Sequence, residues 1–260
     1  MDLNLKDKRA LVCGSTQGIG RATAILLAGE GARITLMARN EDKLKAVLKE
    51  LPGDSDHDYL IGDFFQPDNL RQTVARYLKS NPGFHILINN TGGPKSGLII
   101  DASADEFLSA FNQHLICNHE LTKLTVPFMK EKGYGRIINV ISTSVKEPIP
   151  GLGVSNTIRN AVANWSKTLA GELGGHGITV NNVLPGFTQT ERLNEIIRIK
   201  AQREERTEAE MAEIMKNYTP ARRFAHPEET AQAIAFLSSD KASYINGINL
   251  PVDGGRTKSL

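Results

Sequence analysis

The chain has 260 residues, of which 40% are hydrophobic and 23% charged, and its formal net charge is +2. These values are typical of a soluble globular protein and lack the strongly basic balance of a nucleic-acid-binding chain, so we expect no nucleic-acid partner. The apolar runs are too short to span a membrane, and the first residues lack the layout of a signal peptide. Cys13 and Cys117 lie in apolar runs and are expected to be reduced core thiols. We therefore expect a cytoplasmic protein without a membrane partner or a metal site.

Strand and helix patterns alternate along the chain, and we expect a single domain over residues 1–260. Short apolar runs predict strands at 10–12, 33–38, 58–62, 85–89, 136–141 and 178–183. Helical patterns lie between and after them, at 21–28, 41–51, 67–79, about 104–130, 152–174 and within 191–219. This alternation predicts an α/β fold, with a doubly wound parallel sheet of about seven strands and helices on both faces. Ligands of such sheets bind at the carboxyl ends of the strands.

A glycine-rich turn separates the first predicted strand from the first predicted helix. Gly14, Gly18 and Gly20 follow a G-x-x-x-G-x-G spacing. Glycine accepts positive φ and lets a phosphate approach the backbone, while the free N–H groups and the dipole of the helix attract an anion. An ordinary tight turn has the same pattern. The functional interpretation is a pyrophosphate site made by Gly14, Ser15, Gln17, Gly18, Ile19 and Gly20.

Two charged residues bear on the choice of cofactor. Arg39 follows the second strand, where an acidic residue would bind the ribose 2′-hydroxyl of NAD. Its guanidinium instead offers donors to a 2′-phosphate, which favours NADP(H) and leaves NAD(H) as the second choice. A solvated arginine at a strand end is the alternative interpretation. Asp63, just after the third strand, is placed either to accept a hydrogen bond from the adenine amino group or to cap the turn before Pro67.

Further segments fall in a recognisable order. Asn89-Asn90-Thr91-Gly92-Gly93 follows the fourth strand, Pro185-Gly186-Phe187-Thr188-Gln189-Thr190 follows the sixth, and Asp253-Gly254-Gly255 closes a strand-like stretch near the C-terminus. Together with the glycine spacing, these segments resemble the short-chain dehydrogenase/reductase family over nearly the whole chain. The resemblance implies a Rossmann-type fold. It also implies that the cofactor lies against Asn90, Gly92, Pro185, Gly186 and Thr188.

The catalytic pattern of that family is altered in this sequence. The family uses Asn, Ser, Tyr and Lys, with the tyrosine and lysine spaced as Y-x-x-x-K on one helix face. Ser142 falls at the serine position, but Ser155 and Arg159 fall where the tyrosine and lysine are expected. His114 falls where the asparagine is expected. The resemblance therefore implies that Ser142, Ser155, Arg159 and His114 line the reaction site, with Arg159 also near the cofactor ribose.

These replacements change the available acid–base chemistry. A serine hydroxyl is a far weaker acid than a phenol, and arginine keeps its charge and does not relay protons. His114 is the one nearby candidate that titrates near neutrality, although a satisfied core histidine is an equal alternative. Tyr218 lies in the segment expected to cover the site, but nothing in the sequence positions its phenol.

Residues 191–219 are helix-prone and highly charged, and they follow the Pro-Gly turn where the family places its substrate lid. We expect a helical lid over this range. The predicted helices at 104–130 and 152–174 are longer than one sheet needs. Their equivalents in the family pack against a partner subunit, so the resemblance implies a homodimer or homotetramer.

Two functions of different classes remain. The leading hypothesis is an NADP(H)-dependent oxidoreductase that interconverts a carbonyl and an alcohol, acting on a small molecule or an acyl thioester. The sequence resembles a divergent subgroup of 3-oxoacyl-[acyl-carrier-protein] reductase-like members that lack the tyrosine and lysine. The alternative is a nucleotide-binding protein or scaffold that keeps the fold but has lost hydride-transfer turnover.

Overall fold

The structure is a computed structural model and describes residues 2–53 and 55–259. In this part of the chain, parallel strands form one seven-stranded sheet in the order β3-β2-β1-β4-β5-β6-β7. The strands are β1 (Arg9–Cys13), β2 (Arg33–Ala38), β3 (Asp58–Ile61), β4 (Ile86–Asn89), β5 (Gly135–Val140), β6 (Ile178–Pro185) and β7 (Asn249–Val252). The predicted doubly wound α/β sheet is confirmed. The strand order reverses between β1 and β4, and ligands of such sheets bind at this switch point.

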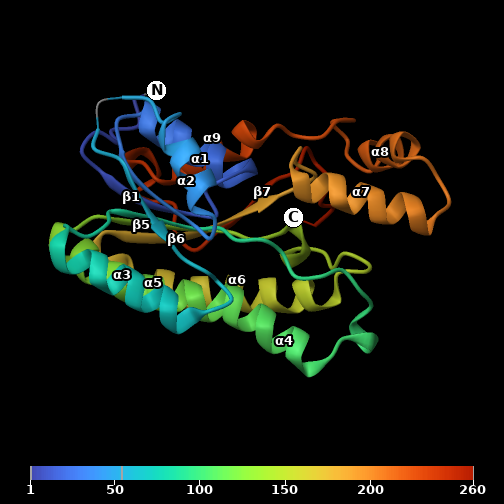
Figure 1. The fold of residues 1–260 in the computed structure, drawn as a ribbon, viewed down its shortest axis with the longest axis horizontal. Coiled ribbons are helices and arrows are strands. Elements are labelled where there is room, and N and C mark those ends of the chain that lie inside the picture. The colour runs from blue at the N-terminus through green and yellow to red at the C-terminus, as the bar shows by residue number, and fades with distance from the viewer. Residues whose placement is uncertain (1, 54, 260) are drawn as a thin grey trace.

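Helices cover both faces of the sheet (Figure 1). One layer holds α1 (Gly18–Gly29), α2 (Glu41–Leu48) and α9 (Pro227–Leu237). The opposite layer holds α3 (Pro67–Ser80), α4 (Ala104–Phe111), α5 (Cys117–Lys132) and α6 (Gly153–Leu173). Two further helices, α7 (Glu191–Arg203) and α8 (Glu208–Asn217), lie together beyond one end of the sheet. Single 3₁₀ turns occupy Ile99–Asp101, Thr143–Val145, Gly174–His176 and Asp240–Ala242.

The alternation of side chains along a buried strand creates two separate cores. On β1, Ala10 and Val12 pack into the core beneath α1, α2 and α9. Leu11 and Cys13 point the other way, into the core beneath α3, α5 and α6. A strand that is buried on both faces carries apolar residues that point to both sides, which explains the continuous apolar runs at 10–13 in β1 and 86–88 in β4.

A ladder of amide side chains crosses four neighbouring strands within this sheet. Asn89, Asn139, Asn182 and Asn249 stand side by side in the register of β4, β5, β6 and β7. The Nδ2 atom of Asn139 donates to Asn182 Oδ1 at 3.0 Å and to Ser166 Oγ on α6 at 2.7 Å. Asn89 donates to Asn139, and Asn182 donates to Asn249, each at 2.8 Å. The ladder pairs buried polar groups and ties α6 to the sheet.

The structure divides the helix that the sequence predicts over 104–130. A π-helical turn, Asn112–Ile116, separates α4 from α5, and the N–H of Cys117 donates to the carbonyl oxygen of Asn112. The turn buries Gln113 and His114. Neither glycine nor proline marks this turn, and helical residues lie on both sides of it, so the sequence pattern does not reveal it. π-turns often occur at functional sites.

Among the described residues, no helix combines the length and the apolar character needed to cross a membrane.

Candidate active site

Most of the predicted site segments lie at or just after the carboxyl end of a strand, whereas His114, Ser155 and Arg159 lie on helical turns. The glycine turn follows β1, Arg39 follows β2 and Asp63 follows β3. Asn90 and Gly92 follow β4, Ser142 follows β5, and the Pro185–Thr188 stretch ends β6. Because the strands are parallel, these segments share one edge of the sheet.

The glycine turn has the backbone that its sequence predicts. Gly14 and Gly18 adopt φ values of +59° and +53°, which residues other than glycine rarely adopt. A Cβ on Gly20 would lie 2.2 Å from the carbonyl oxygen of Gly14, so only glycine fits there. Asn90 fixes the turn from the neighbouring strand, because its Nδ2 atom donates to the carbonyl oxygens of Cys13 and Gly14 at 3.2 and 3.3 Å.

The N-terminus of α1 is left open to an anion. Gln17 precedes the helix without a side-chain capping bond, and the first turn carries no acidic residue. The N–H groups of the first helical turn have no partner within the helix itself. The Ser15 hydroxyl points away from this end, since it accepts from the N–H of Met37 at 3.0 Å on β2. The turn could therefore bind a pyrophosphate through its backbone N–H groups, including those of Gly18 and Ile19, rather than through side chains.

Arg39 and Asp63 both contact Phe65: Arg39 lies near its ring, and Asp63 accepts a hydrogen bond from its backbone N–H. The exposed Arg39 guanidinium lies 5.6 Å from the centroid of the Phe65 ring. The Oδ1 atom of Asp63 accepts from the N–H of Phe65 at 3.0 Å. This hydrogen bond is the one expected if Asp63 caps the turn, and it occupies one of the two carboxylate oxygens. Arg39 remains at the surface with its charge available to a phosphate.

Ser155 and Arg159 lie one turn apart on the buried face of α6. Arg159 Nη1 donates to the carbonyl oxygen of Val140 at 3.0 Å, which holds this part of α6 against the end of β5. Ser142 comes two residues after Val140 and accepts from the N–H of Ser144 at 3.1 Å. The structure therefore brings Ser142 and Arg159 to the same strand end.

His114 is buried on the π-turn, and only 1% of its surface is exposed. Burial, with a smaller effect from the positive charge of Arg159, lowers the pKa of His114 well below its usual value. Its Nε2 atom has no hydrogen-bond partner in the described chain. The imidazole is therefore neutral at neutral pH, and it is available to accept or donate one hydrogen bond.

The structure adds residues that the sequence pattern did not single out. Arg192, on α7, donates through Nη2 to the carbonyl oxygen of Pro94 at 2.9 Å. Gln113, on the π-turn, donates to the hydroxyl of Thr91 at 3.3 Å. The Ser144 hydroxyl is buried without a partner in the described residues. Because Arg192 is one of many charged residues in the segment 191–219, the sequence alone does not indicate that it contacts Pro94.

The segment after β6 leads from the sheet to α7. Gly186 N–H donates to the carbonyl oxygen of Val252 at 2.9 Å, and the Thr188 hydroxyl donates to the carbonyl oxygen of Gly186 at 3.3 Å. Thr190, rather than Thr188, reaches the glycine turn, because its Cγ2 atom lies 2.9 Å from where a Cβ on Gly18 would stand. Thr190 also caps α7, accepting from the N–H of Leu193.

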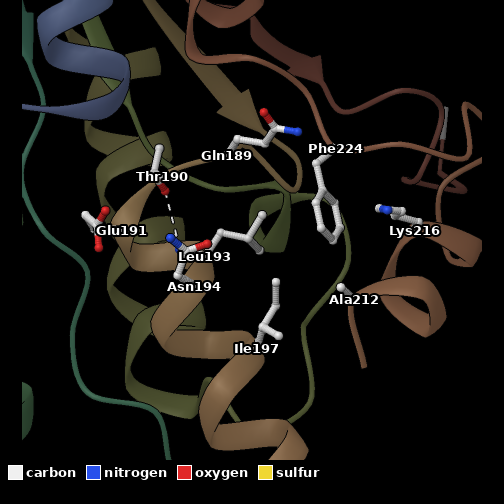
Figure 2. A pocket seen from close by; sticks show the side chains of 9 residues that line it. All are labelled: Gln189, Thr190, Glu191, Leu193, Asn194, Ile197, Ala212, Lys216 and Phe224. Carbon is white, nitrogen blue, oxygen red and sulfur yellow. Dashed lines mark hydrogen bonds between the residues drawn. The ribbon is translucent and has the colours of Figure 1, made fainter. Parts of the chain in front are cut away.

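A cavity of about 480 Å³ opens between α7 and α8 (Figure 2). Leu193 and Ile197 project from α7 toward the side where Ala212, Lys216 and Phe224 lie. The helices share a small core of their own that includes Met211 and Met215. Tyr218 is 60% exposed at the end of α8, so its phenol does not lie in that core.

The comparisons with known proteins agree with this arrangement. Residues 14–257 match a family model described as enoyl-(acyl carrier protein) reductase. A 3-oxoacyl-[acyl-carrier-protein] reductase of Thermotoga maritima is 31% identical over 97% of this chain and 99% of its own length. The NADPH-dependent reductase BacG of Bacillus subtilis is 29% identical over 98% of this chain and all of its own.

Solved structures agree as well. L-Sorbose reductase of Gluconobacter frateurii, solved with NADPH and L-sorbose, is 30% identical over the whole of both chains, with a TM-score of 0.94. The chain therefore belongs to the short-chain dehydrogenase/reductase family of NAD(P)H-dependent oxidoreductases.

Proposed function

We propose that this chain uses NADP(H) to interconvert a carbonyl and an alcohol, with an altered catalytic set. The observation that carries the proposal is the uncapped N-terminus of α1 behind an intact glycine turn, next to the polar groups at the ends of β4 and β5. When bound, NADPH supplies a hydride. Gly14, Gly18, Ile19 and Gly20 would hold its pyrophosphate, and Arg39 its 2′-phosphate. Relatives whose names specify NADPH support this choice of cofactor.

In this proposal Ser142 and Ser155 hold the substrate oxygen, and Arg159 and His114 stand in the positions of the family's lysine and asparagine. A neutral His114 does not store a proton at pH 7, so it orients the substrate by a hydrogen bond. The relatives' names support carbonyl substrates as different as 3-oxoacyl thioesters and a sugar. We also propose that residues 191–219 form a lid, since Arg192 on α7 bonds to Pro94 in the segment that follows β4.

The oligomeric state belongs to the same proposal. Leu108 and Phe111 on α4 are 60% and 37% exposed, and Ile100 just before α4 is 87% exposed. An apolar surface of this kind favours a second copy as the partner, in a homodimer or homotetramer.

The alternative function, a nucleotide-binding protein without turnover, is favoured by one observation: Ser155 and Arg159 offer no acid comparable to a phenol. NADPH oxidation over a panel of ketones, sugars, oxo acids and oxoacyl thioesters separates the two, with NADPH binding measured in parallel. We expect binding and turnover of at least one carbonyl class. Binding without turnover on the whole panel supports the alternative, and absence of NADPH binding contradicts both.

A further inference from the structure

We propose that Arg159, assisted by Arg192, binds a carboxylate of the substrate, so that the carbonyl compound reduced at this site is a small oxo acid. The inference rests on the proposed function, because it names the substrate class of the same site. It follows from a comparison of the buried arginines within this chain.

Arg159 is a buried arginine that has neither an ion pair nor a full set of hydrogen bonds among the described residues. Its side chain is 7% exposed, its Nη1 atom bonds to Val140 O, and its Nε atom is buried without a partner. Within residues 2–53 and 55–259, no carboxylate forms an ion pair with it. Burying a charge is costly unless it is paired and hydrogen-bonded.

The other buried arginines are satisfied. Arg136, 3% exposed, donates to the carbonyl oxygens of Gly135, Gly177 and Ser239, and it lies 3.8 Å from a carboxylate oxygen of Asp240. Arg9, 8% exposed, donates through Nε to a carbonyl oxygen and through Nη2 to a phenol. Arg9 has no ion pair among the described residues either, but its Nε and Nη2 atoms are both hydrogen-bonded. Arg159 differs from both arginines because its Nε atom is buried without a partner.

A second positive charge stands beside Arg159. The Nη2 atom of Arg159 lies 3.9 Å from where a Cβ on Gly93 would stand. The Nη2 atom of Arg192 donates to the carbonyl oxygen of the next residue, Pro94. Burial, and then the charge of Arg192, lower the pKa of Arg159 to about 10. Among the residues that the structure describes, the one ion pair of Arg192 is with the half-exposed Glu195. An anion between the two guanidinium groups would relieve this repulsion.

The remaining unpaired groups nearby also favour an anion. His114, close enough for its pKa to respond to Arg159, is buried with Nε2 unpaired. Ser144, four residues after Val140, is buried with its hydroxyl unpaired. A guanidinium only donates, and a carboxylate only accepts, so two oxygens match it better than ribose hydroxyls, which also need acceptors. The Gly93 segment, which lies next to the Arg159 guanidinium, is exposed.

Calorimetric titration of the NADP⁺-loaded protein tests the inference without turnover. The probes are benzoylformate and acetoacetate, each compared with its methyl ester, and a neutral acetoacetyl thioester of N-acetylcysteamine. We expect each acid to bind at least tenfold more tightly than its ester. In Arg159→Gln this preference disappears, whereas NADP⁺ affinity stays within about threefold. Arg159→Lys keeps the charge and retains a reduced preference, which guards against misfolding of the first variant.

The matched control is Arg198→Gln, which removes an exposed positive charge from the same helix as Arg192 and should leave the preference unchanged. Equal binding of acid and ester by the unaltered protein, or tighter binding of the thioester, overturns the inference. So does an Arg159→Gln variant that loses NADP⁺ but keeps the acid preference, since Arg159 then serves the cofactor. If NADP⁺ does not bind at all, the proposed function fails. The same acid–ester comparison without NADP⁺ then still decides for or against the carboxylate site.

Discussion

In the proposed active site, Ser155 and Arg159 would determine which protons are available to the substrate. Neither group is an effective acid at neutral pH, because a hydroxyl holds its proton tightly and a guanidinium keeps its charge. His114 does not fill the gap, since burial keeps its imidazole neutral. The site is therefore rich in hydrogen-bond donors and poor in groups that release a proton. This balance suits binding of a negative oxygen better than rapid protonation of an alkoxide.

Restoring the family pair should supply the missing acid. We predict that Ser155→Tyr with Arg159→Lys raises the rate of reduction of a neutral carbonyl, ethyl acetoacetate, by at least about tenfold, equivalent to about 1.4 kcal/mol of barrier. The reason is that an ammonium four residues away lowers the pKa of a phenol. The rate of NADPH oxidation measures the effect. Ser155→Phe with Arg159→Lys is the matched control, and an equal gain in that variant would show that ring packing, rather than the hydroxyl, is responsible.

At the scale of single elements, the sequence predicts what depends on local pattern. The glycine spacing predicts the turn after β1 because Gly14 and Gly18 need positive φ. It does not predict the π-turn at 112–116, since neither glycine nor proline marks the turn and the residues on both sides of it are helical. Nor does it predict that Arg192 meets Pro94 or that Thr190 meets Gly18, because these contacts join segments far apart in the chain. The predicted roles of Ser142, Ser155 and His114 remain predictions.

The asparagine ladder belongs to this scale too. Asn139 bonds to Asn89, Asn182 and Ser166 at once, all of them buried. We predict that Asn139→Leu lowers the free energy of unfolding by at least about 2 kcal/mol, because it removes three buried hydrogen bonds and leaves the buried Asn89 amide without a partner. Urea denaturation followed by circular dichroism measures this change. Asn164→Leu, on the exposed face of α6, is the control and should change stability by less than about 0.5 kcal/mol. Similar losses in both variants would rule out a structural role for the ladder.

For the molecule as a whole, we expect His85, which is partly buried, and His114, which is buried, to reduce stability in acid. Burial, with a contribution from the charges of Lys8, Arg9 and Lys132, lowers the pKa of His85 to about 4. The pKa of His114 is lowered too. Between pH 6.5 and pH 4 the unfolded chain therefore binds more protons at these groups than the folded chain does, and stability falls as the pH falls.

Denaturation measured at pH 7 and pH 5 tests this. We expect His85→Gln to lose less free energy of unfolding between the two pH values than the unaltered protein does. His176→Gln, at an exposed position, should behave like the unaltered protein. If the pH dependence of His85→Gln equals that of the control, the assignment to His85 is wrong.

The assembly is also a property of the whole molecule. We predict a dimer or tetramer at micromolar concentration, because the exposed Leu108 and Phe111 on α4 need a covering surface. Light scattering measures the mass directly, and Leu108→Glu should shift the protein toward smaller species. Exposed Glu172→Ala on α6 serves as the control. A monomer in the unaltered protein contradicts the prediction.

The claim on which the rest depends is that this chain binds NADP(H) at the glycine turn with Arg39 on the 2′-phosphate. Calorimetric titration with NADPH and NADH tests it most directly, in the unaltered protein and in Arg39→Asp. The account predicts at least tenfold tighter binding of NADPH, about 1.4 kcal/mol, and a reversed preference in Arg39→Asp. Equal affinities for the two cofactors in the unaltered protein, or no binding of either, would contradict it.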